Sequence, residues 1–219
     1  MNAPDKAKAL AMRPLPEDAL ILIPMRNTVL FPGVISPITV GRPGSVAAAQ
    51  EAVRSNKPIG FLLQREAEKN DVKPSDLYWV GTSGSVVRYI TGNEGAHHLV
   101  VQGQSRFRVL EFLEGWPFLV ARIAAVEARD ETSPEIEARF LQLKQQAAEA
   151  IELLPGAPGE LALVVQGMTS PGQLADMVAN LLDVKSGDKQ DLLETFELRR
   201  RLDKVIARLS ERVGVLRIS

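Results

Sequence analysis

The chain has 219 residues, a length that suits one large domain or two modest ones. With 45% hydrophobic and 24% charged residues, it has enough apolar sequence to bury the core of an ordinary globular protein. Its formal net charge of -1 excludes a global attraction to nucleic acid or to an anionic membrane. The absence of cysteine excludes disulfides, thiol nucleophiles and cysteine metal sites, and it is compatible with the cytoplasm.

The chain begins with a polar segment, residues 1–18, that lacks the apolar core of a secretory signal. No apolar stretch approaches the roughly 20 residues that a membrane-spanning helix needs. We therefore predict a disordered tail at residues 1–18, a cytoplasmic protein and no membrane partner.

Residues 19–128 are rich in short β-branched and aromatic segments, which Gly, Pro and Asn turn signals separate. The predicted strands lie at residues 20–25, 37–41, 58–64, 78–90, 97–103, 104–114 and 117–128. One helix interrupts the series, with Ser45 as its predicted N-cap and with Asn56 and Pro58 as its stop signals. Many short strands with turn residues and one or two helices predict a small, partly closed β-barrel.

Residues 129–219 change to a helical periodicity, in which Ser133 and Ser170 are predicted N-caps that each precede a proline. Shorter helices are predicted at residues 161–168 and 173–182. One apolar stripe consists of Ile136, Phe140, Leu143, Ala147, Ile151 and Leu154, and a second of Leu198, Leu202, Val205, Leu209, Val213 and Leu216. The last helical stretch is predicted to start at Asp188, and it reaches the final residues without a stop signal. We therefore expect a truncated chain or a helix that packs against a partner.

The sequence contains no constellation of catalytic residues. It has no GxxxxGK[ST] phosphate loop, and its only histidines, His97 and His98, are adjacent on a predicted strand. Adjacent strand residues point to opposite faces, so the two histidines cannot easily share a metal. The glycines of VGTSGS (80–85) precede a β-branched segment and no helix, which favours a turn or bulge over a phosphate cradle. We expect no enzyme activity, metal or cofactor in this chain alone.

Two kinds of binding surface remain open. Basic and aromatic residues, interleaved with acids, could form a local RNA-binding patch: Arg88, Arg106, Arg108 and Arg122 with Tyr89, Phe107 and Trp116. An apolar surface that holds extended or unfolded peptide fits better with the Pro-rich loops and an incompletely paired barrel edge. Residues 21–42 form a nearly continuous apolar run that prolines and glycines interrupt.

Four segments resemble, in order and spacing, the N-terminal, substrate-recognition region of the Lon family of ATP-dependent proteases. They are IPMRNTVLFPGVISPITVGR (23–42), YWVGTSGSV (78–86), VVQGQSRFRVLEF (100–112) and LADMVANLLDVKSGDKQDLLETFELRRRLDKVIARL (174–209). The resemblance covers nearly everything from Leu20 to Ser219.

The resemblance implies an α+β fold, in which a PUA-like β pseudo-barrel at residues 19–128 precedes an α-helical bundle at residues 129–219. The last, long helix of the bundle would lead into a coiled-coil arm. Full-length members continue into an AAA+ ATPase module and a Ser-Lys peptidase domain, and neither a Walker A motif nor that dyad occurs here. The chain is therefore expected to be the non-catalytic recognition part of an ATP-dependent serine protease, whose ATP and Mg would bind elsewhere.

As partners the resemblance implies unfolded, damaged or degron-bearing proteins, which are captured for protein quality control, and further copies in a homohexamer. DNA binding, which some members show, is a secondary expectation. The alternative is a stand-alone PUA-like module that binds RNA or protein.

For the peptide-binding surface we predict a loop with aromatic partners: Met25, Phe31, Pro32, Val34, Ile35, Trp79, Tyr89 and Trp116. The final helix is predicted to form the arm or oligomer contact through Leu198, Leu202, Val205 and Leu209. Packing in the core is the competing interpretation for each residue of the peptide-binding set. The exposure of residues 31–35 decides between the two.

Overall fold

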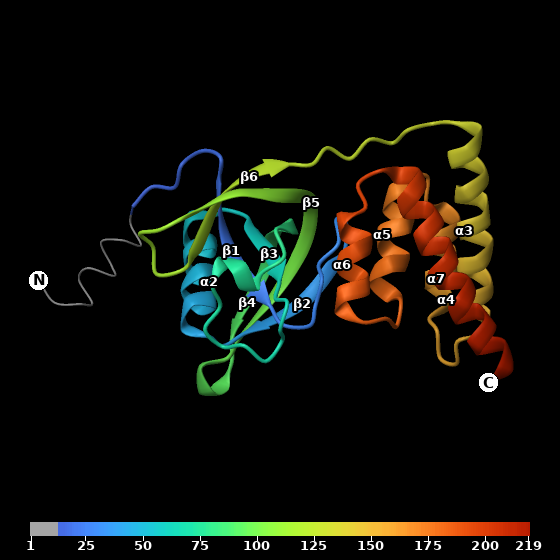
Figure 1. Cartoon of the computed structure of the whole chain (residues 1–219). Coiled ribbons are helices and arrows are strands. Elements are labelled where there is room, and N and C mark those ends of the chain that lie inside the picture. Colours follow the sequence, from blue (N-terminus) through green and yellow to red (C-terminus); the bar gives the residue numbers. More distant parts are fainter. Residues whose placement is uncertain (1–12) are drawn as a thin grey trace, which may run out of the picture. The chain divides into compact units, whose positions relative to one another are not determined.

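The computed structural model describes residues 13–219, and its internal contacts divide the chain between Glu127 and Ala128 into two compact units. We call the first the β unit and the second the helical unit (Figure 1). Residues 1–12 of the predicted tail lie outside the described residues. The first described residue, Arg13, contacts the β unit, where the Trp116 indole donates a hydrogen bond to the Arg13 carbonyl at 3.2 Å.

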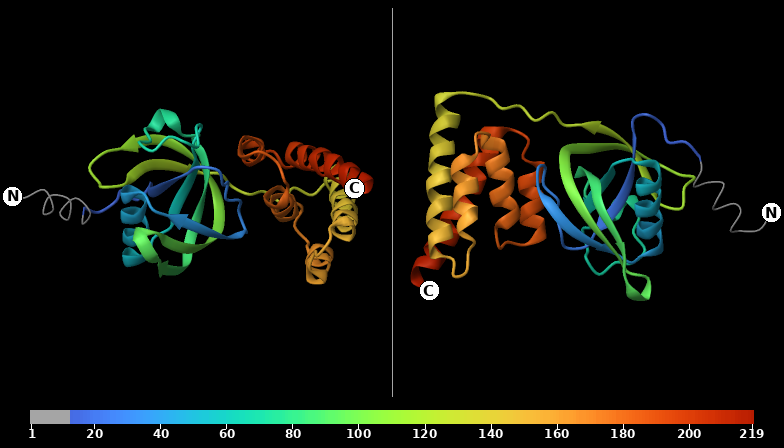
Figure 2. Two further views of the ribbon diagram at one scale, coloured as in Figure 1. Left: turned by 90° about the horizontal axis from the view of Figure 1, so that it is seen from below. Right: turned by 180° about the vertical axis from the view of Figure 1, so that it is seen from behind.

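The β unit is built on one mixed, six-stranded sheet. Its strands are β1 (Ala19–Met25), β2 (Ile35–Val40), β3 (Ile59–Leu63), β4 (Val80–Thr91), β5 (His97–Leu113) and β6 (Leu119–Ala125). They lie in the order β2-β5-β4-β3-β1-β6, with β1 and β3 parallel and the other pairs antiparallel. Because β6 pairs with β5 as well as with β1, five strands form a closed circuit of pairings, and β2 remains an edge strand (Figure 2).

The burial of β1 on both faces explains why apolar and polar residues do not alternate at the start of the apolar run. Ile21 and Ile23 enter one core cluster, while Leu20 and Leu22 enter a second one on the opposite face of the strand. A strand that is buried on both faces needs apolar residues at consecutive positions. Full burial of one such side chain contributes about 1.5–3 kcal/mol.

Strand β5 corrects the prediction of two separate strands at residues 97–103 and 104–114. It is one strand of 17 residues, and Gly103 lies within it. A Cβ atom on Gly103 would lie 2.2 Å from the Phe31 carbonyl oxygen, and the Gly103 carbonyl accepts a hydrogen bond from Gly33 N at 2.9 Å. This glycine therefore permits the loop after β1 to approach β5, and it does not end a strand.

The VGTSGS segment forms the first half of β4, where the pairing with β5 shifts register between Thr82 and Gly84. Where a turn or bulge was predicted, the strand continues through an irregularity of its pairing. A Cβ atom on Gly81 would lie 2.2 Å from the Phe61 carbonyl oxygen, so the glycine serves the close packing of strands β3 and β4.

Helix α2 (Pro43–Ser55) follows β2 and packs its alanines into the core that holds Ile21 and Ile23. Its N-cap is Arg42, and the predicted cap Ser45 lies buried inside the first turn. The correction has a simple cause: Pro43 fixes φ near the helical value, so the helix can begin there. Asn56 closes the helix in the left-handed conformation, as its predicted stop signal indicates.

The helical unit contains α3 (Pro134–Leu153), α4 (Gly159–Gly167), α5 (Pro171–Leu181), α6 (Ser186–Glu194) and α7 (Leu198–Ile218). The predicted caps are confirmed, since Ser133 and Ser170 each accept a hydrogen bond at 3.2 Å from a backbone N–H of the first turn. The long helices α3 and α7 run in the same direction, because Arg139 pairs with Asp203 and, further along both helices, Glu149 pairs with Arg217. Exposed pairs contribute about 0–1 kcal/mol each, so the apolar stripes stabilise this contact more strongly.

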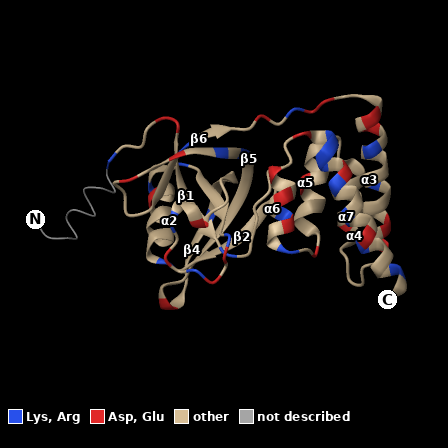
Figure 3. Cartoon of the chain, in the orientation of Figure 1, with Lys and Arg blue, Asp and Glu red and all other residues tan. Residues whose placement is uncertain are grey.

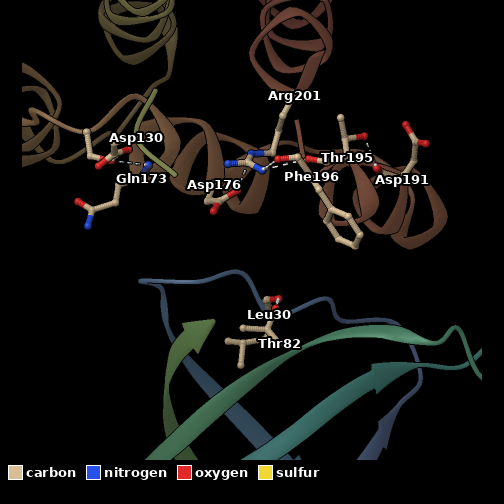
Figure 4. A network of polar contacts seen from close by, with 10 residues as sticks. Leu30, Thr82, Asp130, Gln173, Asp176, Asp191, Thr195, Phe196 and Arg201 are labelled. Carbon is tan, nitrogen blue, oxygen red and sulfur yellow. Dashed lines mark hydrogen bonds and ion pairs between the residues drawn. The ribbon is translucent and has the colours of Figure 1, made fainter. Parts of the chain in front are cut away.

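The predicted single helical stretch from Asp188 is two helices, which residues 195–197 separate. Arg201 is buried at this break, where its guanidinium lies 3.5 Å from Asp176 of α5 and donates to the carbonyl of Thr195 at 3.0 Å (Figure 4). Thr195 follows directly on the last residue of α6, and carbonyls at a helix end have no partner within the helix. The arginine thus stabilises a chain reversal that the periodicity of residues 188–219 conceals.

Acidic and basic residues are interspersed along the helices and the loops (Figure 3). In the part of the chain that the structure describes, no helix is both long and apolar enough to cross a membrane. The mixed sheet and the helices together confirm the α+β class.

Candidate functional site

The predicted peptide-binding loop is only partly exposed. Phe31 has 0% of its surface exposed, which contradicts its predicted place on the surface, whereas Ile35 is 63% exposed. Two hydrogen bonds help to hold the loop against the sheet. Gly33 N donates to the Gly103 carbonyl, and Thr82 Oγ1 donates to the Leu30 carbonyl at 2.6 Å (Figure 4). These bonds fix the backbone so that the Phe31 ring enters the core.

The other members of the predicted loop surface are Met25, Pro32 and Val34, and all three are half-buried. Met25 packs partly against the core and lines an open pocket at the end of β1. Peptide binding by these residues and by Ile35 stays a prediction.

The predicted aromatic partners are engaged in separate local contacts. Trp79 donates to the Pro74 carbonyl at 3.1 Å and lies edge-on to Phe112 at 5.3 Å between ring centroids. The Tyr89 hydroxyl lies 2.5 Å from Nδ1 of His97. Trp116 lies beneath the Arg13 guanidinium at 5.3 Å. Among residues 13–219, no ring contact joins these three aromatics to one another or to residues 31–35.

The four residues that were predicted to form the arm or oligomer contact on the last helix are not exposed. Leu198, Leu202, Val205 and Leu209 are all buried within the helical unit. The stripe faces α3 and α5 of the same chain, so these side chains are already covered. The periodicity identified an apolar face correctly, but it could not say which helix covers that face.

The alternative RNA-binding patch also loses its main members. Phe107 is in the core and Arg106 is buried, so neither can stack on or bind an exposed base. Arg122 is paired with Asp18 at 3.6 Å. Arg88 on β4, Arg108 on β5 and the paired Arg122 on β6 are the arginines of the patch that remain exposed.

The two histidines face different partners, as the strand geometry predicts. His97 contacts Tyr89, while Nδ1 of His98 lies 3.0 Å from the Thr39 hydroxyl on β2. Within residues 13–219, no group of three or more His, Asp or Glu side chains is placed to hold a metal ion.

The helical unit holds an open apolar pocket of about 130 Å³ that the sequence did not single out. Helices α3, α4, α5 and α7 contribute its walls, which include Ile151, Leu154, Leu161, Met177, Leu181, Leu209 and Leu216. An apolar cavity of roughly this size, about 150 Å³, accepts a benzene-sized group. The pocket therefore suits one apolar side chain of a bound partner.

The two predicted stripes lead into this pocket. On α3, Leu143 is buried, but Ile151 and Leu154 at the end of the helix line the pocket. On α7, Leu202 is buried, and Leu216 near the end lines the pocket. Both apolar faces therefore extend beyond the part that the chain itself covers.

Helix α4 adds apolar surface beside the pocket. Its sequence, GELALVVQG, has one buried residue, Val165, and leaves Leu163 74% exposed. The sequence signal available for this site was the apolar composition of this short segment, whose exposure only the structure shows.

Charged groups border the pocket sparsely, through Asp183 and Arg212. Nearby, the Lys189 ammonium donates to the Asn180 carbonyl at 2.5 Å. Burial lowers the pKa of Lys189, and the Asp183 carboxylate opposes that shift. The pocket is thus an apolar surface for contacts, without the convergent polar groups that chemistry requires.

Comparison with protein families decides the relationship. Residues 19–211 match the model of the ATP-dependent protease La (LON) substrate-binding domain. The chain belongs to this family. The resemblance that the four sequence segments indicated is confirmed.

Full-length relatives in the Lon family are similar over nearly the whole chain. A Lon protease of Methylocella silvestris is 47% identical over 203 residues, which cover 93% of this chain and 25% of the relative. A Lon protease of Phenylobacterium zucineum is 47% identical over 208 residues, with 94% and 26% covered. The chain therefore spans about a quarter of the length of these Lon relatives.

Solved structures show the same fold. The N-terminal domain of a Mycobacterium avium complex Lon protease superposes with a TM-score of 0.72 at 19% identity, over 88% of this chain and 98% of that one. A Lon N-terminal domain protein from Xanthomonas campestris gives 0.61 at 20% identity, over 86% and 97%.

Proposed function

We propose that this Lon substrate-binding domain captures unfolded, damaged or degron-bearing proteins through the apolar pocket of the helical unit. The open ends of the α3 and α7 stripes support the proposal, because apolar side chains that water surrounds gain free energy when a partner covers them. Hydrophobic contact is non-directional, so one pocket can accept many client sequences.

Degradation would take place in the whole protein, an ATP-dependent serine protease of protein quality control that acts in the cytoplasm as a homohexamer. ATP and Mg would bind to its ATPase module, and hydrolysis of the client would take place in its peptidase domain. We further propose that residues 19–128 form a PUA-like pseudo-barrel and residues 129–219 a bundle that leads into a coiled-coil arm. The closed circuit of strand pairings supports the first assignment.

The test uses a fluorescein-labelled peptide of about 20 residues rich in Leu and Phe, whose anisotropy reports binding to the 219-residue chain. We expect a dissociation constant in the micromolar range. Leu181→Ser should raise it about fivefold to tenfold, because it removes part of the roughly 1.5–3 kcal/mol of a buried leucine.

Leu141→Ser is the matched control, since Leu141 is 55% exposed on α3 outside the pocket and Leu181 is 58% exposed. Both substitutions should leave the unfolding transition nearly unchanged. Equal affinities of the two variants for the peptide would contradict the proposed site.

A further inference from the structure

The β unit has an open pocket of about 700 Å³ where the end of β1, the β2 strand and the start of α2 meet. Two arginines of the apolar run, Arg26 and Arg42, line it together with the hydroxyl residues Thr28, Thr39 and Ser45. The remaining wall is largely apolar, as at Met25. Two cations at one pocket in a chain of net charge -1 require an explanation.

Among residues 13–219, Arg26 donates hydrogen bonds to uncharged acceptors only. Its guanidinium donates to the carbonyls of Ala67 at 2.7 Å and Lys69 at 3.2 Å, and to Oδ1 of Asn70 at 2.7 Å. These bonds tie the side chain to the 65–73 loop. In the described part of the chain, no carboxylate pairs with its positive charge.

Arg42 is also uncompensated. Its Nη2 donates to the Pro24 carbonyl at 2.8 Å, while its Nη1 is buried and has no hydrogen-bond partner among residues 13–219. Burial lowers the pKa of Arg42, and the nearby charge of Arg26 lowers it further. A buried donor that lacks an acceptor costs free energy, which an added acceptor would recover.

The start of α2 adds positive potential at the same place. This 13-residue helix has neither an acidic residue in its first turn nor a side-chain cap. The free N–H groups of a helix start favour negative charge. Arg26, Arg42 and the start of α2 therefore all contribute positive potential at this pocket. No ion pair in the described chain balances either arginine.

We propose that Arg26 and Arg42 form a binding site for a carboxylate of a captured polypeptide, either an acidic side chain or the C-terminal carboxylate. The planar guanidinium matches a carboxylate with paired hydrogen bonds. The apolar wall at Met25 suits the hydrocarbon next to that carboxylate. The identity of the ligand as a polypeptide rests on the proposed function.

The test compares three forms of one labelled peptide on the whole chain. The first is neutral, with an amidated C-terminus and internal Gln; the second has a free C-terminus; the third has internal Glu in place of Gln. At low salt, at least one carboxylate form should bind about fivefold or more tightly than the neutral form. In Arg42→Gln this ratio should fall to about one, and in Arg42→Lys it should lie between.

Arg88→Gln is the control, because it removes the same charge from an exposed site near Asn56 at the opposite end of α2. It should retain the wild-type ratio. Circular dichroism checks that each variant is folded.

Equal binding of all three peptides by the wild type would overturn the carboxylate site and leave the proposed function intact. If no peptide binds, the proposed function fails, and acetate alone then tests the site. A saturable shift of the Arg42 Nε–Hε NMR signal with acetate, absent with chloride at equal ionic strength, would support it. The absence of that shift would overturn it.

Discussion

The two units differ in how completely their apolar segments are buried. In the β unit the long apolar run is mostly covered: β1 is buried on both faces, and Phe31 points inward. In the helical unit the stripes of α3 and α7 continue past their cover, and α4 buries one residue. The difference shows that exposure depends on what packs against a segment, and that a conspicuous apolar run is a poor guide to exposed apolar surface.

The largest expected effect is a loss of stability in the β unit, where the apolar run is buried. Phe31→Ala should destabilise the β unit by about 3–5 kcal/mol, because it leaves a cavity in the core. Ile35→Ala, at an exposed position of the same loop, should change stability by less than about 0.5 kcal/mol. Urea unfolding followed by tryptophan fluorescence measures both, since Trp79 and Trp116 lie in the β unit. Similar losses in the two variants would contradict the burial of Phe31.

The next effect concerns the polar contact that shapes the helical unit. Asp176→Ala should cost about 3–5 kcal/mol, because it leaves the buried Arg201 charge without its carboxylate. The double variant Asp176→Leu with Arg201→Met should recover most of that loss. Circular dichroism at the helical band during urea unfolding reports this unit. A single variant as stable as the wild type would show that the pair does not hold the α6–α7 reversal.

A smaller loss of stability is expected at the start of α3, the helix that carries one of the two apolar stripes. Ser133→Ala removes the hydrogen bond to Ile136 N and should cost about 1 kcal/mol. Ser210→Ala, at an exposed position inside α7, serves as the control and should be neutral or slightly stabilising. If both variants unfold at the same urea concentration, the cap contributes nothing.

The smallest expected effect is a pH dependence of stability that arises from Asp76 of the β unit. A hydrogen bond from Lys69, and a second from the Lys73 backbone, lower the pKa of Asp76 in the β unit below its ordinary value of 3.8. Its contribution to stability is therefore present above that value and is lost as the pH falls through the lower, folded-state pKa. Asp76→Asn should lower the tryptophan-monitored midpoint at neutral pH, and the difference from the wild type should shrink on acidification. A difference that grows with acid would contradict this sign.

Local signals in the sequence predicted the strands, the Ser133 and Ser170 caps and the Lon family. What they missed depends on tertiary contacts. Gly103 was predicted to end a strand, but it lets the Phe31 carbonyl approach β5 closely. The chain reversal between α6 and α7 depends on a hydrogen bond from the buried Arg201, which the helical periodicity does not show. The candidate pocket was missed because its walls come from four helices, and periodicity cannot show where a stripe loses its cover.

Methyl NMR tests the central claim most directly, that clients bind at the open ends of the helical stripes. The εCH₃ group of Met177 and the δCH₃ groups of Leu181 line the pocket, whereas Leu141 lies outside it. On titration with the Leu- and Phe-rich peptide, the Met177 and Leu181 signals should shift together and saturate, while the Leu141 signals stay in place. Saturable shifts confined to the β unit, for example at Ile35, with unchanged Met177 and Leu181 signals would contradict the account.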